Sequence, residues 1–450
     1  MLDHSISIID FTILLLVVVI TICVSVVGIK SYPKYNNKAS ELLEYWLMGR
    51  RLTLPVFVAT LTSTWYGGIF SVTQIAFEHG IYSFISQGVV WYIVYISFAL
   101  FAVKRLERGN LISIPDLICR KYGHTSGNIS AIILFIKSLP ITYAISMGAF
   151  LHAMFNIDIS FGIFLSCLFV TISCMLGGFR GLVFRDIVQF CVMYAGALSV
   201  VLFAIYKFGV SEYLSSKLSS NYFSLSGNHQ LSAIILWFIV AFSSVFVSPI
   251  FYQRCMAASS KKVAKYGVLI STFLWLIFDL CTVLGGMYAK ATMPDTNSLY
   301  AYLFFGISIL PCGFKGLFLA GIIATTLSTL DAFLFVSSSI IAYDLSPKHL
   351  RGSKILRIFS TIACGFCVFI ISIFAGENME AVIIAFEICS CAPLIIPILF
   401  SYLFKRNFIL NDAQCTSSIL LCVISICVLR LLKYEMDYIF LGTVNKGFAK

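Results

Sequence analysis

The chain contains 450 residues, of which 60% are hydrophobic and only 11% are charged. Soluble globular proteins carry about 25% charged residues, so this composition excludes a soluble protein and predicts a polytopic membrane protein. The formal net charge is +11, but the basic residues collect in alternate predicted loops, so nucleic-acid binding is not indicated.

Apolar runs long enough to cross a hydrocarbon core of about 30 Å follow one another along the chain. These runs, twelve in all, cover residues 9–29, 53–76, 80–103, 129–155, 159–177, 184–208, 231–256, 265–289, 314–344, 355–375, 380–404 and 416–432. Lys and Arg gather in every second connection, which predicts a cytoplasmic location for those connections and an N-terminus outside. The first run has no small-residue cleavage site, so we expect a retained helix and one integral plasma-membrane domain over residues 1–450.

Two of the predicted loops between the apolar runs are themselves expected to contain a short helix. Residues 112–122 predict a short cytoplasmic amphipathic helix with Pro115 near its start, and residues 300–310 predict a lid helix in an outer loop.

The 15 cysteines lie mostly inside apolar runs without metal-ligand spacing, so we interpret them as small buried hydrophobic residues. We find no nucleophile–base arrangement and no organic cofactor motif, which argues against an enzyme.

Two of the runs contain residues that interrupt a helix. The second run holds the pair Gly67 and Gly68, and each Gly costs about 1 kcal/mol relative to Ala in a helix. The seventh run holds Pro249, which removes a backbone hydrogen bond. These runs are five spans apart, and interrupted helices at corresponding positions of two inverted repeats indicate a binding site. Close packing of small residues is the alternative explanation for the glycines.

Ser328, Thr329 and Asp331 lie in the middle of the run 314–344. A carboxylate at that depth costs at least ~2.5 kcal/mol unless it is paired or faces a cavity. Hydroxyl, carboxylate and loosened carbonyl oxygens are the ligands that hard cations take. This run therefore predicts a cation site.

Further ionisable residues inside the runs include Lys137, Asp186, Asp279 and Glu387. Such residues form either a functional pathway or an internal ion pair. Pairing of Lys137 with Asp331 or Glu387 is one interpretation, and contact of Lys137 with a substrate carboxylate is another.

Four stretches of the chain form a pattern that resembles the sodium:solute symporter family. They are residues 47–52 with 76–80, residues 177–189, residues 253–259, and residues 324–331 closing with 343–345. The resemblance covers roughly residues 45 to 345. It implies an all-α, LeuT-type core of two inverted five-helix repeats, about 53–208 and 231–404, with the extra helix 9–29 before it and a peripheral helix 416–432 after it.

The resemblance also implies a sodium site between the first and eighth core helices. Five of the family's sodium ligands can be placed on this chain by position. They are two side-chain hydroxyls and three backbone carbonyls, and two of these carbonyls lie in the unwound first core helix. The hydroxyls fall on Ser328 and Thr329, and the carbonyls on Thr325, Leu61 and Thr64.

Two carboxylates carry further expectations from the resemblance. Asp186 matches an acidic residue near the inward exit of sodium or a second sodium site. Members with that second site have hydroxyls where this chain has Asp331 and Ala332. We therefore expect Asp331 either to strengthen such a site or to bind a proton.

Substrate residues do not carry over, because Trp65 and Gly68 stand where relatives have polar side chains on the first core helix. We expect a pocket lined by residues of helices that face the cavity in this fold. The candidates are Thr62, Ser63, Trp65, Tyr66, Gln87, Ser243, Ser244 and Glu387.

The function that we expect is sodium-coupled uptake of a small polar organic solute, with sodium as co-substrate, no organic cofactor, and a monomer in the lipid bilayer as the working unit. Two alternatives stay open. One is a proton-coupled carrier of the same fold that titrates Asp331 or Asp186, and the other is a membrane sensor that binds solute without transporting it.

Overall fold

Helices make up the computed structural model almost throughout its described part, which comprises residues 6–31, 38–106, 111–227, 229–347, 349–351, 353–375, 391–402 and 410–431. Seven described helices are long and apolar enough to cross a membrane, or eight if the bent pair α12–α13 counts as one span. The main elements are α1 (Ile8–Lys30), α2 (Lys38–Leu47), α3 (Leu54–Trp65), α4 (Ile69–His79), α5 (Val90–Ser97) inside the span Phe84–Arg105, α8 (His124–Lys137), α9 (Ile141–Phe155), α10 (Ile159–Phe208), α12 (Leu231–Phe246), α13 (Pro249–Ala257), α14 (Lys261–Thr292), α16 (Phe314–Ser339), α17 (Lys354–Ala375) and α19 (Asp412–Leu431).

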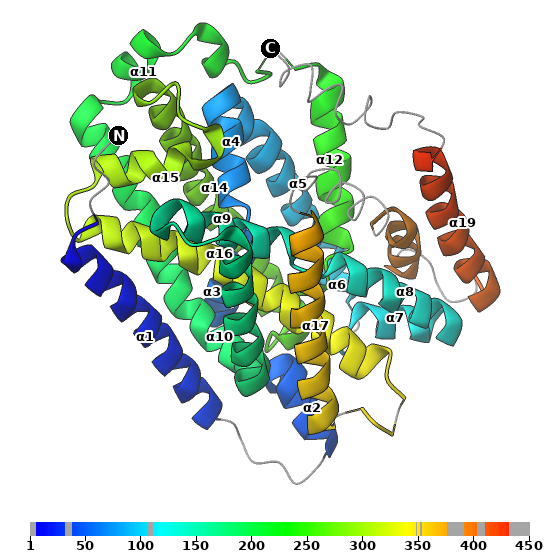
Figure 1. Ribbon diagram of the computed structural model, residues 1–450. Helices are drawn as coiled ribbons and strands as arrows, with labels where there is room; N and C mark the ends of the chain where they lie inside the picture. Colours follow the sequence, from blue (N-terminus) through cyan, green and yellow to red (C-terminus); the bar gives the residue numbers. More distant parts are fainter. Residues whose placement is uncertain are drawn as a thin grey trace.

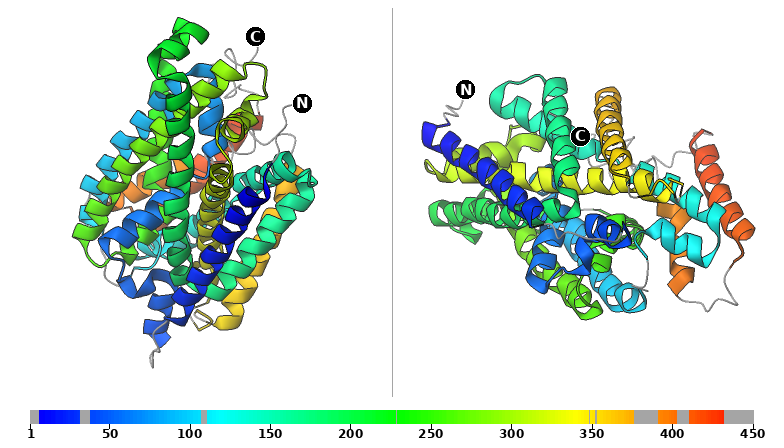
Figure 2. Two further views of the ribbon diagram at one scale, coloured as in Figure 1. Left: turned by 90° about the vertical axis from the view of Figure 1, so that its left-hand side faces the viewer. Right: turned by 90° about the horizontal axis from the view of Figure 1, so that it is seen from below.

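Each predicted apolar run coincides with helical residues, and the eleventh is described only over Cys391–Tyr402. The two predicted helices in connections also form, as α7 (Ile114–Lys121) and α15 (Ser298–Ile309). Ser113 caps α7 by accepting a hydrogen bond from the backbone N–H of Asp116, which explains where this helix begins. In Figures 1 and 2, α1 and α19 lie at opposite sides of a bundle whose centre holds α3 and α16.

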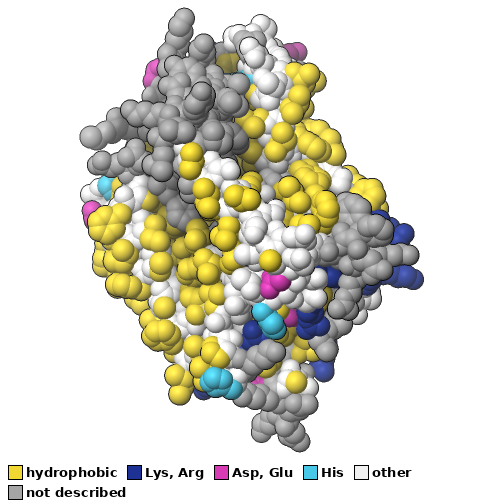
Figure 3. Space-filling view, turned by 90° about the vertical axis from the view of Figure 1, so that its right-hand side faces the viewer, with side chains coloured by type: hydrophobic (Ala, Val, Ile, Leu, Met, Phe, Trp, Pro, Cys, Tyr) yellow, Lys and Arg dark blue, Asp and Glu magenta, His cyan; other side chains and the backbone are white. Residues whose placement is uncertain are grey.

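The outer face of the bundle is apolar, as expected for contact with lipid. On α1, for example, Ile8 is 82% exposed and Val27 is 58% exposed. Hydrophobic side chains cover wide areas of the face in Figure 3, and the Lys and Arg side chains visible there gather at its lower right. An apolar surface of this extent is not found on soluble monomers, so it fits a bilayer.

Three membrane-spanning segments are interrupted, and each interruption has a local cause. α3 ends at Trp65 and α4 begins at Ile69, so the predicted break lies at residues 66–68, around the glycine pair. α12 and α13 meet at 45° just before Pro249. The third break, between α8 and α9, lies next to Pro140, whose missing N–H prevents a continuous helix.

The long element α10 joins two predicted spans through a sharp corner at Gly178. Its backbone angles there are φ 53° and ψ −161°, a region that is essentially restricted to glycine. A Cβ atom at this position would lie 2.9 Å from the ring of Tyr45, which leaves no room for a side chain. The corner therefore depends on glycine twice, for its backbone angles and for its packing.

The N-terminal end of α1 is fixed to the start of α16 by one buried carboxylate. Asp10 accepts hydrogen bonds from the backbone N–H groups of Gly313 at 2.7 Å and Gly316 at 2.9 Å. Asp10 is 1% exposed, and a Cβ at Gly316 would lie 2.2 Å from the Asp10 carbonyl oxygen. The first helix therefore docks through the helix N-terminus of α16, where a negative charge is stabilised.

The two interrupted helices of the core are joined where α3 begins and α13 ends. The backbone N–H of Leu52 donates to the carbonyl of Ala257 at 3.1 Å, and the N–H of Ser259 donates to the carbonyl of Leu52 at 2.9 Å. Arg180 on α10 pairs with Glu44 on α2 at 2.6 Å on the same side of the molecule. The two backbone hydrogen bonds of Leu52 fix the start of α3 against the end of α13.

We predict that Gly178→Ala lowers the apparent melting temperature of the detergent-solubilised protein, because the strain of about 1–3 kcal/mol for a non-glycine residue in this backbone region adds to the clash with Tyr45. Gly177→Ala is the matched control, since its Cβ would lie no closer than 3.7 Å to any neighbour. Equal melting temperatures for the two variants would contradict this account of the corner.

Candidate functional site

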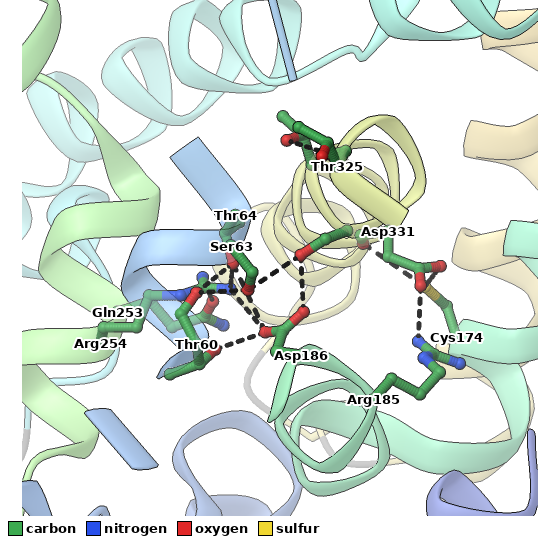
Figure 4. Close-up of polar contacts among 12 residues, drawn as sticks. Thr60, Ser63, Thr64, Cys174, Arg185, Asp186, Gln253, Arg254, Thr325 and Asp331 are labelled. Carbon is green, nitrogen blue, oxygen red and sulfur yellow. Dashed lines mark hydrogen bonds and ion pairs between the residues drawn. The ribbon is translucent and has the colours of Figure 1, made fainter. Parts of the chain in front are cut away.

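A buried carboxylate, Asp186 on α10, lies at the centre of a polar cluster in the middle of the bundle. It is 1% exposed, and its Oδ1 accepts a hydrogen bond from the Ser328 hydroxyl on α16 at 2.7 Å. Its Oδ2 accepts a hydrogen bond from the Thr60 hydroxyl on α3 and lies 3.4 Å from the Thr64 hydroxyl. One side chain thus links three helices, as the dashed lines in Figure 4 show.

The contribution of α3 follows from helical spacing. Thr60, Ser63 and Thr64 are three and four residues apart, which places them on one face of the helix. The Ser63 hydroxyl lies 3.2 Å from the Ser328 hydroxyl, so this face meets α16 as well as Asp186. Ser63 was expected in the substrate pocket and Thr60 was not predicted as a site residue, although this helical spacing was a signal that could have found both.

The charge of Asp186 is matched by Arg254, which follows the proline break in α13. The Arg254 Nη2 lies 3.7 Å from Asp186 Oδ2 and donates to the Thr64 hydroxyl at 3.0 Å. Both charged side chains are almost completely buried. Because removing one partner from a buried ion pair costs about 3–5 kcal/mol, this pair fixes α10, α13 and α3 relative to one another.

The second predicted carboxylate, Asp331, does not join this cluster. It forms an ion pair of 3.1 Å with Arg185, and Cys174 lies 3.5 Å from its carbonyl oxygen. In Figure 4 Asp331 and Arg185 lie to the right of Asp186, and no dashed line joins them to it. The proposed pairing of Asp331 with Lys137 was therefore wrong, because the carboxylate of Asp331 pairs with Arg185 instead. The expected role of Asp331 at a second ion site or on the exit path of sodium stays a prediction.

The predicted backbone ligands on the first core helix need a correction. α3 is helical through Trp65, so Leu61 and Thr64 do not lie in an unwound segment as expected. The last four carbonyls of a helix lack intrahelical partners, which leaves the Thr64 carbonyl available but not that of Leu61. One of these end carbonyls, that of Thr62, accepts a hydrogen bond from the Trp275 indole at 3.1 Å.

Thr329 lies against the break in the first core helix. A Cβ atom at Gly67 would lie 2.6 Å from the Thr329 side chain, so the chain between α3 and α4 approaches α16 as closely as glycine permits. The Thr329 hydroxyl donates to the Thr325 carbonyl at 3.1 Å. Of the predicted α16 ligands, Ser328 thus reaches Asp186 directly, whereas Thr325 and Thr329 are joined to each other beside the break.

A cavity of about 230 Å³ borders the same break. Four of the residues predicted to line a pocket do so, namely Trp65, Tyr66, Gln87 and Ser244. Thr62 and Ser63 lie outside its lining, and the Ser243 hydroxyl instead donates to the carbonyl of Ile239 at 2.8 Å within α12. Glu387 lies outside the described residues.

Most of the cavity lining was not predicted from sequence. Aromatic rings dominate it, and two ionisable groups also border it: Lys137, for which contact with a substrate carboxylate was one of two interpretations, and Asp279, which had been noted only as a buried charge. The unpredicted lining residues are Gly68, Ser71, Val72, Trp91, Tyr92, Tyr95, Lys137, Tyr143, Ser248, Trp275, Asp279 and Phe333.

Chemically, the cluster offers oxygen ligands for a small cation and the cavity offers an aromatic site for a small solute. Hydroxyl, carboxylate and carbonyl oxygens suit hard cations. Within the described ranges no group of three or more His, Cys, Asp or Glu side chains is placed to hold a metal ion. The segment 60–68 contributes to both sites, so a change in its position affects both.

We predict that Gly67→Ala lowers the melting temperature, whereas Gly68→Ala leaves it nearly unchanged. A methyl group at Gly67 would overlap the Thr329 side chain, and a methyl group at Gly68 meets no atom within 4 Å. Overpacking of this kind typically costs about 1–3 kcal/mol. Thermal unfolding of both purified variants tests the predicted contact between the break and α16, and equal destabilisation by the two substitutions would contradict it.

Comparison with known proteins gives a consistent result over most of the chain. Residues 45–408 match the model of the sodium:solute symporter family. The sodium/pantothenate symporter of Haemophilus influenzae is 28% identical over 357 residues, which cover 74% of this chain and 73% of that protein. The sodium/pantothenate symporter of Escherichia coli is 23% identical, with 75% and 74% covered.

The arrangement of the helices also matches a solved structure. A Na+-coupled sialic acid symporter in a substrate-bound, outward-open state aligns with a TM-score of 0.72 and 16% identity, over 95% of this chain and 98% of that chain. This likeness confirms the predicted LeuT-type fold.

Proposed function

Because the chain belongs to the sodium:solute symporter family, we propose that it performs sodium-coupled symport of a small polar organic solute by alternating access. The observation that carries the proposal is the contact of three membrane helices at Asp186, one of which, α3, continues directly into the wall of a cavity of solute size. Interrupted helices that meet at the middle of two repeats are where such carriers hold ions and solutes.

The sodium site that we propose lies between the end of α3 and α16. Its ligands are the hydroxyls of Ser328 and Thr329, the carbonyls of Thr325 and Thr64, and the carboxylate of Asp186. Support comes from the 2.7 Å bond between Ser328 and Asp186 and from the close approach of Gly67 to Thr329. Neutral oxygens around a single carboxylate suit a monovalent ion better than a divalent one.

Sodium in this position draws the end of α3 and the break toward α16. Since Trp65 and Tyr66 follow Thr64 directly and line the cavity, the bound ion also fixes the cavity wall. Sodium then raises the affinity for solute, and solute raises the affinity for sodium by the same factor. Release of sodium past Asp186 loosens both sites together.

In this proposal the repeats of about 53–208 and 231–404 move against each other within one monomer in the plasma membrane, with the N-terminus outside. A proton-coupled carrier is the first rival, and its titrating group is Asp331 or Asp186, each of which lies beside an arginine, Arg185 and Arg254 respectively. A sensor that binds solute without transport is the second rival.

We predict that an inward sodium gradient drives accumulation of labelled solute in proteoliposomes. Pantothenate is the first probe, because it is the solute in the names of two relatives, and D-glucose and choline are the alternatives. A pH gradient in sodium-free buffer should not replace sodium. Accumulation driven equally well by that pH gradient would favour the proton-coupled carrier, and solute binding without counterflow would favour the sensor.

We predict that the double variant Ser328→Ala, Thr329→Ala raises the sodium concentration for half-maximal solute binding at least tenfold, because two hydroxyl ligands are lost. The matched control is Ser337→Ala, Ser338→Ala on the same helix, where both hydroxyls donate to carbonyls of α16, at 3.0 and 2.9 Å. Sodium titrations of solute binding by both purified variants provide the measurement. An unchanged sodium requirement in the first variant would exclude this ion site.

A further inference from the structure

We propose that the cavity selects a small organic monocarboxylate that has hydrogen-bond acceptors but no ammonium group, and that Lys137 binds the carboxylate. This inference rests on the proposed function, since it names the class of solute for the same carrier. Four features of the cavity carry it: one cationic group, two unpartnered donors, one closed carboxylate and aromatic walls.

The cationic group comes from the break between α8 and α9. Lys137 is the last residue of α8, and its side chain lines the cavity, where its ammonium group lies 3.0 Å from the Cys391 sulfur. The C-terminal end of a helix stabilises a positive charge. A carboxylate that enters the cavity can form a charge-assisted hydrogen bond with this ammonium group, the stronger class of hydrogen bond.

Two further donors border the same cavity. The side-chain nitrogens Nε2 of Gln87 and Nε1 of Trp91 are buried and have no hydrogen-bond partner among the described residues. The indole nitrogen can only donate, and the amide nitrogen likewise carries only N–H groups. Buried donors without partners are costly, so a solute with carbonyl or hydroxyl oxygens gains binding free energy by satisfying them.

Asp279 on α14 also lines the cavity, but both oxygens of its carboxylate are already hydrogen-bonded to neighbouring tyrosines. The Tyr66 hydroxyl donates to its Oδ1, and the Tyr92 hydroxyl donates to its Oδ2. The Tyr66 hydroxyl is also 2.9 Å from the Thr282 hydroxyl, and Asp279 is only 3% exposed. Each oxygen can accept a further hydrogen bond, but the carboxylate is buried behind the two tyrosines, so an ammonium group would have to displace them to reach Asp279. The cavity therefore disfavours amino acids and other organic cations.

Aromatic rings surround the space between these polar groups. The rings of Trp65 and Trp91 meet edge to face with centroids 6.3 Å apart, and Trp275 packs against Tyr95 at 4.6 Å. The Trp65 indole donates to the Tyr95 hydroxyl, so its polar atom is not available to solute. These walls suit the carbon skeleton of a solute whose polar groups lie at its ends.

The test is equilibrium binding to the full-length protein in detergent, with and without sodium. The probes are pantothenate, which combines a carboxylate with an amide and hydroxyls, and L-phenylalanine, choline and D-glucose. We expect pantothenate to bind in sodium at least tenfold more tightly than the other three. Tighter binding of choline, phenylalanine or glucose would overturn the proposal.

Substitutions then test the assigned groups. We expect Lys137→Gln to weaken pantothenate binding at least tenfold, Lys137→Arg to retain most of it, and Lys207→Gln, at an exposed lysine of α10, to leave it unchanged. Unchanged binding in Lys137→Gln would overturn the assignment of the carboxylate. If Lys137→Gln does not fold, Trp91→Phe, which removes only the indole donor, is measured instead, and its binding must weaken severalfold or the proposal fails.

Comparison of solute binding with and without sodium distinguishes a failure of this inference from a failure of the proposed function. Binding of pantothenate that depends on Lys137 but not on sodium would support the solute class and contradict sodium coupling. Sodium-dependent binding of a solute without a carboxylate would support sodium coupling and overturn the solute class.

Discussion

A carboxylate buried inside a membrane protein has to be compensated, and most of the central architecture depends on how this is done for Asp186. Arg254 supplies the countercharge, and hydroxyls of α3 and α16 supply hydrogen bonds. Since a buried carboxylate without partners costs several kcal/mol, the four helices that meet here have little freedom to separate. A sodium ion at the proposed site would meet a carboxylate that is already paired with Arg254, so its binding would rely largely on neutral oxygen dipoles.

The polar cluster around Asp186 and the cavity are formed by different residues, but the residues that α3 contributes to each follow one another directly in the sequence. Thr60 and Thr64 belong to the cluster, and Trp65 and Tyr66 belong to the cavity lining. The break at residues 66–68 follows at once, and Gly67 brings it into contact with Thr329. A displacement of about one helical turn of α3 therefore changes both sites. This continuity gives a physical route for coupling that needs no long chain of intermediate residues.

Hydropathy alone located the membrane helices, because the need to satisfy backbone groups in lipid leaves helices as the available structure. The breaks near Gly67 and Pro249 were also predictable, since these residues have local effects that do not depend on their neighbours. Partners across helices were not predictable in the same way. The pairing of Asp331 with Arg185 depends on the rotation of α16 and α10, and the inward or outward direction of Ser243 depends on the rotation of α12. The helical state of Leu61 and the aromatic lining of the cavity likewise follow from tertiary packing, which a single sequence does not encode locally.

The docking of α1 through Asp10 has a consequence for how the protein is made. Asp10 and its partner Gly313 are 303 residues apart, so the first helix enters the membrane long before the N–H groups that neutralise its carboxylate exist. At typical translation rates of about 5–20 residues per second, the interval is about 15 to 60 s. The contact between α1 and α16 therefore forms only after most of the described transmembrane helices have been synthesised.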